Sequence, residues 1–324
     1  AFLPYFEALF KITTSLGLLE TANLNHPLLK KLLLNAPGTY QHSLMVANLS
    51  EAGAEAIGAD VILARIGAYF HDIGKMKRPI FFSENQFSSA NPHDNLSPRM
   101  SKLIISAHPK DGVELAQKHK LPKILQDIMM EHHGTSLVSF FYSVAKQQAS
   151  LQEEEDTIQD DFRYPGPKPQ TKESGIIMLA DATEAAIRSI DKPTLPKIEN
   201  LIDKVFSSKM TDNQLSESNL TFNNVQKIKT TFISIFKSIY HNRLEVLKDA
   251  KALLNDHPQF VHPIEEVRRY KALLLVNDEE AYLSVRAWQF LYNAREIIKM
   301  PNCLRSDKTA VIMVHPWGID DGQG

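Results

Sequence analysis

A single helix and its end can be recognised in the stretch Ile62-Leu63-Ala64-Arg65-Ile66-Gly67-Ala68-Tyr69-Phe70-His71-Asp72-Ile73-Gly74-Lys75. Apolar side chains recur in it every three or four residues, which is the spacing of one face of an α-helix. Asp60 precedes the stretch as an expected N-cap, and Gly74 follows His71 and Asp72 where the helix is expected to stop. The stretch therefore predicts a packed helix that presents a His-Asp pair at its C-terminal end.

The same helical spacing continues through most of the chain, and strand-like alternation is almost absent. Helix starts are predicted from about Thr39 after Pro37-Gly38, at Ser97-Pro98 and at Pro122. The aromatic run Phe140-Phe141-Tyr142 is interpreted as core in preference to a base-stacking surface. We predict an all-α bundle up to about residue 254.

The chain of 324 residues is long enough for two domains. We expect an N-terminal helical segment over residues 1–36, a main helical domain over 37–254 and a C-terminal appendage over 255–324. In the appendage we predict two helices followed by a strand at Ala310-Val311-Ile312-Met313-Val314. Residues 151–172 are acidic and then proline-rich, which predicts a loop; it is either a lid or binding loop or a solvated insertion.

The composition excludes several classes of protein. A balance of 36 Lys and Arg against 38 Asp and Glu gives a formal charge of -2, so we expect no binding of long nucleic acids. Cys303 is the single cysteine, which excludes an internal disulfide and favours the cytoplasm. No run reaches the roughly 18 apolar residues of a membrane span. The amphipathic start at Ala1 nevertheless predicts a longer protein, in which a membrane segment can precede this chain.

Candidate metal ligands follow one another along the chain in a set of five histidines and two aspartates: His42, His71, Asp72, His108, His132, His133 and Asp181. Neighbouring residues of a helix point about 100° apart, so a His-Asp or His-His pair can serve one site only near a helix end. Imidazole and carboxylate ligands without thiolate suit first-row divalent ions; iron or manganese is favoured, with zinc or nickel also compatible.

We predict two metal ions that share Asp72 as a bridge. One ion is assigned to His42, His71, Asp72 and Asp181, and the other to Asp72, His108, His132 and His133. Two such ions about 3.5 to 4 Å apart would activate a water molecule for an in-line phosphoryl displacement. The constellation therefore predicts phosphoester hydrolysis, with Asp72 in a catalytic role.

Three further residues are candidates for substrate contacts. Lys75 lies three residues after Asp72 and is assigned to a substrate phosphate and to catalysis, with a capping role at the helix end as the alternative. Arg188 lies two turns after Asp181 and is either a phosphate ligand or part of a surface ion pair. His93 is the best substrate-facing candidate among the other histidines.

The chain resembles the cytoplasmic HD domain of bacterial seven-transmembrane HD-family proteins, the PgpH-type cyclic di-AMP phosphodiesterases. The resemblance covers about residues 1–246 and rests on Ala36–Leu44, Gly67–Pro79, Asn91–Asp94, Glu131–Thr135, Phe162–Pro167 and Leu179–Ala186. It implies a di-metal site with iron or manganese, ligands at the seven residues named above, and hydrolysis of cyclic di-AMP to linear pApA. The resemblance also implies that the protein is attached to a membrane only through a region upstream of this chain. A homodimer is compatible with the resemblance. Gln41 stands where the family often has a second, non-ligating histidine.

Alternatives from other classes stay open at this point. An HD-GYP enzyme for cyclic di-GMP would carry Gly-Tyr-Pro after the His-His pair, where Gly134-Thr135-Ser136 stands here. A single-metal nucleotide phosphohydrolase would need only His42, His71, Asp72 and Asp181. A catalytically silent cyclic di-AMP sensor would be favoured by loss of ligands, and none is lost. Histidines packed in a core without metal would each need a hydrogen-bond partner.

Overall fold

The computed structural model describes residues 15–21, 23–86, 91–148, 159–190, 193–256, 283–291 and 296–304. The chain divides into two compact units, Ala1–Leu244 and Glu245–Gly324. The predicted domain limits at residues 36 and 254 stay a prediction. No helix in the described ranges combines the length and the apolar character that crossing a membrane would require.

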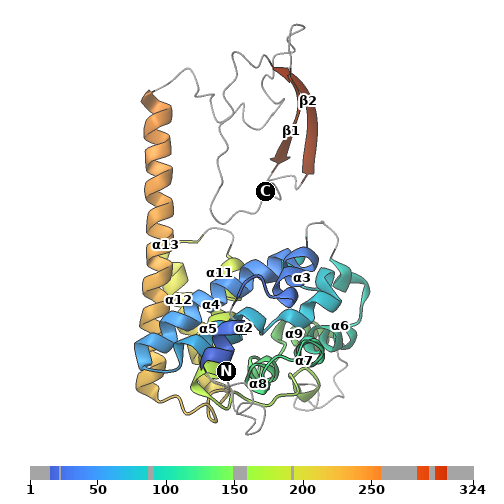
Figure 1. Ribbon diagram of the computed structural model, residues 1–324, viewed down its shortest axis with the longest axis vertical. Helices are drawn as coiled ribbons and strands as arrows, with labels where there is room; N and C mark the ends of the chain where they lie inside the picture. The colour runs from blue at the N-terminus through green and yellow to red at the C-terminus, as the bar shows by residue number, and fades with distance from the viewer. Residues whose placement is uncertain are drawn as a thin grey trace. The chain divides into compact units, whose positions relative to one another are not determined.

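The first unit is built from α-helices joined by short turns and 3-10 helices (Figure 1). The α-helices are α2 (Ser15–Thr21), α3 (Pro27–Asn35), α4 (Pro37–Ile57), α5 (Val61–Phe70), α6 (Pro98–Ser106), α7 (His108–Lys118), α8 (Lys123–Glu131), α9 (Ser139–Gln148), α11 (Lys172–Arg188), α12 (Leu195–Thr211) and α13 (Phe222–Asp256), the last of which continues into the second unit. The 3-10 helices are η1 (Ile73–Lys77), η2 (Pro79–Phe81), η3 (Ser83–Asn85) and η4 (Pro92–Asn95). The prediction of an all-α bundle is confirmed for this unit.

Helix starts agree with the predicted caps. Asp60 accepts a hydrogen bond from Leu63 N (2.9 Å) at the start of α5, and Ser97 accepts one from Met100 N (3.3 Å) at the start of α6. Pro122 directly precedes α8, and α4 begins at Pro37, two residues before the predicted start. Proline at a first helical position loses no hydrogen bond, because the N–H groups of that turn have no intrahelical partner.

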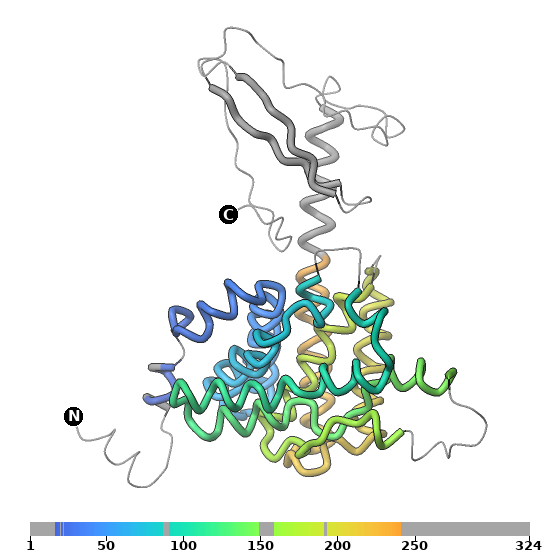
Figure 2. Tube along the Cα trace, turned by 90° about the vertical axis from the view of Figure 1, so that its right-hand side faces the viewer, coloured from blue at the N-terminus to red at the C-terminus, as the bar shows by residue number. Residues whose placement is uncertain are grey.

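The core lies where α4, α5 and α11 pack against one another. Large side chains of this core are fully buried, among them Leu49, Ile66, Ile128, Ile177 and Phe232. Figure 1 shows α6 to α9 gathered on one side of these helices and α12 on the other, and Figure 2 shows the same unit after a quarter turn. The central helices are thus the rigid support from which side chains of α4, α5 and α11 can be aimed at a common point.

The aromatic run in α9 is not all core. Phe140 is 68% exposed, whereas Phe141 and Tyr142 are partly buried. The interpretation as core is wrong for Phe140, because α9 packs mainly against α6 and leaves its opposite face uncovered.

The second unit contains a strand pair where helices were predicted. Strands β1 (Leu283–Leu291) and β2 (Glu296–Leu304) are antiparallel, with Leu283 opposite Leu304 and Leu291 opposite Glu296. The helix prediction is wrong for these residues: β1 contains valine, tryptophan and phenylalanine, which favour strands, and pairing with β2 decides the outcome. The strand predicted at 310–314 lies outside the described residues.

Candidate metal centre

His71 and Asp72 lie in the turn after the end of α5, as predicted for a pair that serves one site. α5 ends at Phe70 and η1 begins at Ile73, so both side chains leave the regular helix. Both residues are fully buried. His71 Nδ1 donates to Ala68 O (2.7 Å), which leaves Nε2 as the nitrogen that faces Asp72 Oδ2, at 3.3 Å.

His108 and His132 repeat this arrangement at two other helix ends. His108 is the first residue of α7, and its Nδ1 donates to Ile105 O (2.6 Å). His132 follows α8, and its Nδ1 donates to Met129 O (2.8 Å). Each imidazole thus bonds the carbonyl three residues earlier, which selects the tautomer with a free Nε2 lone pair and fixes the ring.

His133 is oriented differently from its neighbour. Its Nδ1 lies 3.4 Å from Asp181 Oδ2 and its Nε2 lies 3.1 Å from His108 Nε2. Gly134 follows with φ of +54°, a conformation that glycine adopts without strain, and the chain turns away there. The open turn lets both imidazoles of the pair face the same cluster.

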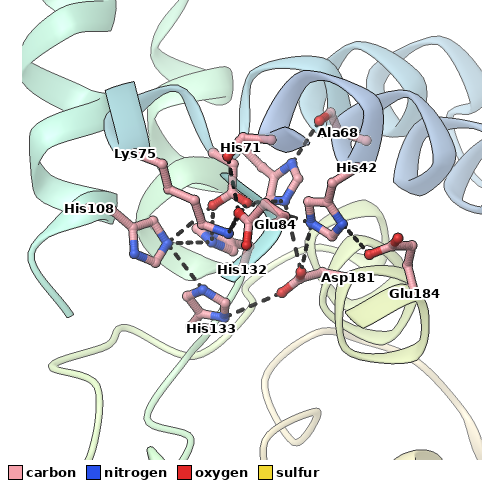
Figure 3. Close-up of polar contacts among 12 residues, drawn as sticks. His42, Ala68, His71, Lys75, Glu84, His108, His132, His133, Asp181 and Glu184 are labelled. Atoms are coloured by element: carbon pink, nitrogen blue, oxygen red, sulfur yellow. Dashed lines mark hydrogen bonds and ion pairs between the residues drawn. The ribbon is translucent and has the colours of Figure 1, made fainter. Parts of the chain in front are cut away.

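His42 and Asp181 come from α4 and α11, which pack against each other. His42 Nε2 lies 3.1 Å from Asp181 Oδ1, and its Nδ1 contacts Glu184 Oε2 one turn further along α11. Figure 3 shows His42 between these two carboxylates, with the His71 ring beside it. Glu184 therefore orients His42 in the way that backbone carbonyls orient the other histidines.

The side chains converge in two groups that share Asp72. The first ligand group is His42, His71, Asp72 and Asp181, and the second ligand group is Asp72, His108, His132 and His133. In each group one nitrogen or oxygen atom per residue lies within 4.8 Å of the others. Asp72 Oδ2 faces His42 (3.5 Å) and His71 (3.3 Å), while Oδ1 faces His108 (3.2 Å) and His132 (3.6 Å). The two groups are those expected for two metal ions bridged by one carboxylate.

The unsatisfied atoms of the site fit bound cations. His71 Nε2 and Asp72 Oδ1 are buried without a hydrogen-bond partner in the described structure, and Asp72 Oδ2 is paired with the Lys75 ammonium (2.7 Å). His108 Nε2 lies 3.2 Å from His132 Nε2 and 3.1 Å from His133 Nε2. The Nε2 atoms of His108 and His132 both carry a lone pair that is directed into the site. Buried polar atoms without partners are costly, and divalent ions would satisfy them all at once. The donor set therefore fits two first-row divalent ions.

Burial and the neighbouring charges favour the ligand forms of several groups. Burial lowers the pKa of His132 to about 4 and that of His133 well below its ordinary value, so both rings are neutral. Burial alone would raise the pKa of Asp72, but Lys75 and His71 outweigh it and hold that pKa well below the usual range. For His42 the balance is the opposite: burial is outweighed by Asp181 and Glu184, which raise the pKa to about 9 and favour the protonated ring.

Lys75 lies at the edge of the first ligand group. Its ammonium is 2.7 Å from Asp72 Oδ2 and 2.8 Å from Glu84 Oε1, and the residue is only 8% exposed. The Lys75 ammonium thus contacts carboxylates of the site. The alternative role, capping of the helix end, would have required contacts with backbone carbonyls of the helix. Arg188 NH2 lies 3.8 Å from both Glu84 Oε2 and Glu184 Oε2, and its side chain is 35% exposed. Contacts of Lys75 and Arg188 with a substrate stay a prediction.

His93 is not part of either ligand group. Its Nε2 donates to Phe81 O (2.9 Å), and its ring packs against Phe81 and Phe141, with centroids 5.3 and 4.9 Å away. Its Nδ1 is buried without a hydrogen-bond partner among the described residues. The predicted substrate contact of His93 stays a prediction.

Three residues at the centre were not selected from the sequence: Glu84, Glu184 and Tyr164. Glu184 could have been selected from the sequence, since it lies one helical turn after Asp181. Glu84 could not have been selected from the sequence, because η3 reaches the site only through tertiary packing against α4. Tyr164 lies in the proline-rich segment, and its ring stacks on His133 (centroids 4.3 Å apart, planes at 30°).

Comparisons with known proteins agree with this geometry. A family model described as HD domain matches residues 39–186. The chain is 51% identical over 243 residues to the cyclic-di-AMP phosphodiesterase PgpH of Bacillus subtilis and 46% identical over 247 residues to that of Listeria monocytogenes, covering 75% and 76% of this chain and 34% of each relative. The crystal structure of the L. monocytogenes PgpH HD domain in complex with cyclic-di-AMP matches with a TM-score of 0.64 and 46% identity, over 67% of this chain and all of that one.

This chain belongs to the HD-domain family, in its PgpH type. The resemblance stated from the sequence is thereby confirmed. The chain spans about a third of the length of the two PgpH relatives, so the similarity concerns their HD domain. Histidine and aspartate at the end of α5 are the pair from which this HD domain can be recognised in the sequence.

Proposed function

We propose that this HD domain is a di-metal phosphodiesterase that hydrolyses cyclic di-AMP to linear pApA. The observation that carries the proposal is the placement of Asp72, whose two oxygens face two different sets of imidazoles. One carboxylate that serves two ligand groups is what a pair of adjacent ions needs. Iron or manganese is the proposed metal, because all seven donors are imidazole nitrogens or carboxylate oxygens.

Two divalent ions in these groups would supply a water of lowered pKa and stabilise charge on both oxygens of an in-line displacement. The protein supplies the geometry for that chemistry. Backbone carbonyls and Glu184 hold four imidazoles in one tautomer and one orientation. A water molecule attacks phosphorus, the P–O3′ bond breaks, the 3′ oxygen receives a proton, and the phosphate stays on the 5′ oxygen.

Lys75 and Arg188 are proposed to bind the phosphate. The Lys75 ammonium is held beside Asp72, where it can stabilise charge that develops on a phosphate oxygen next to the ions. Arg188 lies further out and is more exposed, with Glu84 and Glu184 as its neighbours at 3.8 Å. Its guanidinium can reorient toward an incoming phosphate because those ion pairs are long and partly solvated.

Cyclic di-AMP is proposed as the substrate from the relatives. Two relatives with about half of their aligned residues identical are named cyclic-di-AMP phosphodiesterases, and a related HD domain has been solved with that ligand. The seven ligand-type residues are all present here, which supports hydrolysis over a silent sensor.

The test is product analysis of the purified chain loaded with manganese or iron. It is incubated separately with cyclic di-AMP, cyclic di-GMP and a deoxynucleotide triphosphate, and metal content is measured on the same sample. We expect selective formation of pApA, about two ions per chain, and loss of activity after chelation that added metal restores. Cyclic di-AMP that stays intact with a full metal site would refute the proposed activity.

A matched pair of variants tests the metal assignment. His71→Ala/Asp72→Ala should lose metal and hydrolysis together. Asp203→Ala serves as the control, since that carboxylate pairs with Lys229 at the surface (2.8 Å, 51% exposed) and should leave both unchanged. Activity in the double variant would rule out the shared-carboxylate site.

A further inference from the structure

The segment that carries Tyr164 is fastened to the loop that follows the His132–His133 pair. Tyr164 N donates to Ser136 O (3.0 Å), and Val138 N donates to Phe162 O (2.9 Å). Phe162 is fully buried and anchors the segment. The backbone of Tyr164 therefore keeps its position relative to the second ligand group.

Arg163 fastens the segment a second time. Its guanidinium forms a two-pronged ion pair with Asp212 (3.1 and 2.9 Å) and also donates to Thr135 O (2.9 Å). Gln214 Oε1 accepts from Thr135 N (2.9 Å), so the turn after α12 also holds this loop. A bidentate arginine–carboxylate pair has a defined geometry, so it restricts the backbone at Arg163. This restriction limits movement of the neighbouring Tyr164 away from the metal centre.

The Tyr164 ring covers the second ligand group. It stacks on His133 and lies edge-on to His108, with centroids 6.1 Å apart and planes at 82°. Two of the proposed ligands of one ion thus form the surface on which the ring rests. Stacking of this kind fixes the orientation of the phenol ring against these two imidazoles.

The Tyr164 hydroxyl belongs to a ring that packs against two proposed metal ligands, His133 and His108. The Tyr164 side chain is only partly exposed, and no hydrogen bond of its hydroxyl occurs within the described ranges. A phenol O–H held beside a metal centre without a protein acceptor is a donor available to a ligand.

We propose that Tyr164 is a substrate-binding residue whose hydroxyl donates a hydrogen bond to a non-bridging oxygen of the phosphodiester at the metal centre. The ring would at the same time shield the His108 and His133 side of the site from water. This inference rests on the proposed function and assigns a role to the proline-rich segment, namely that of a fixed wall of the substrate site.

The test compares Tyr164→Phe with Tyr142→Phe, the same change at a tyrosine of α9. Metal content, thermal unfolding and steady-state kinetics are measured with cyclic di-AMP and with bis(4-nitrophenyl) phosphate, a phosphodiester without adenine. We expect Tyr164→Phe to keep its metal and its unfolding temperature while kcat/KM falls about ten-fold for both substrates, as for loss of one hydrogen bond. Tyr142→Phe should match the parent protein. Tyr164→Leu should fall further and bind metal less well, because His133 loses its stacking partner.

The outcomes separate the two proposals. If the parent protein cleaves only bis(4-nitrophenyl) phosphate, the proposed substrate is wrong. The role of Tyr164 is then tested by the ratio of kcat/KM between the parent and Tyr164→Phe on that diester. If neither diester is cleaved, both proposals are overturned. If Tyr164→Phe stays within two-fold of the parent on a substrate that is cleaved, the hydroxyl has no such role, and a defect confined to Tyr164→Leu would reduce the residue to a structural one.

Discussion

Replacement of Gly74 by alanine should damage the second ligand group selectively. Gly74 lies in η1, where its backbone meets the first turn of α7. A Cβ at this position would lie 1.9 Å from His108 O and 2.5 Å from Gly112 N. Because Cβ contacts below 3.0 Å essentially do not occur, the two backbones must separate by about 1 Å.

The expected magnitude follows from that displacement. His108 Nε2 now lies 3.2 Å from Asp72 Oδ1, and a shift of about 1 Å would pull the imidazole out of coordination range. We expect turnover to fall about 100-fold and the free energy of unfolding to drop by about 1 to 3 kcal/mol, as for other overpacked sites. Metal content should fall from about two ions to about one, because the first ligand group does not include His108.

The assay measures metal content, hydrolysis and chemical unfolding on the same preparations. Gly112→Ala is the control from the opposite side of the same contact: its Cβ would meet Gly74 N at 3.4 Å, an ordinary van der Waals distance. That control should keep both ions and its activity. A Gly74→Ala protein with two ions and parental turnover would show that the close approach of η1 and α7 does not position His108.

Three other perturbations test the site and its limits. Glu184→Gln should weaken metal binding about 10- to 100-fold, because the carboxylate orients His42 from outside the ligand group; unchanged metal affinity in a titration would contradict this. Lys75→Ala should reduce kcat more than it reduces stability, since its ammonium contacts Asp72 and Glu84 at the centre; an equal loss of stability in thermal unfolding would favour a structural role. Truncation after residue 254 should leave hydrolysis intact, because the solved HD domain corresponds to 67% of this chain; an inactive truncated protein would place the second unit in the catalytic machinery.

The helical fold and the candidate metal-ligating residues could be proposed from the sequence because both rest on local patterns. Asp60, Ser97 and the prolines mark helix starts through hydrogen bonds with the next few residues, and the structure has them there. The pairing of β1 and β2 could not be predicted in the same way, since the strands are stabilised by each other and not by the spacing of their own residues. Phe140 was misjudged for a related reason: aromatic character does not say whether another element covers that face.

The sequence by itself determined which atoms are available for the site: five imidazoles and two carboxylates, placed at helix ends or on helices, with no thiolate beside them. It also determined the tautomers of His71, His108 and His132, because their Nδ1 partners are carbonyls only three residues away. Only the tertiary structure decided which oxygen of Asp72 faces which group, and that Glu84, Glu184 and Tyr164 adjoin the site. The physical reason is that these contacts join segments far apart along the chain. Their distances depend on how α4, α5, η1, α7 and α11 pack, which no local pattern specifies.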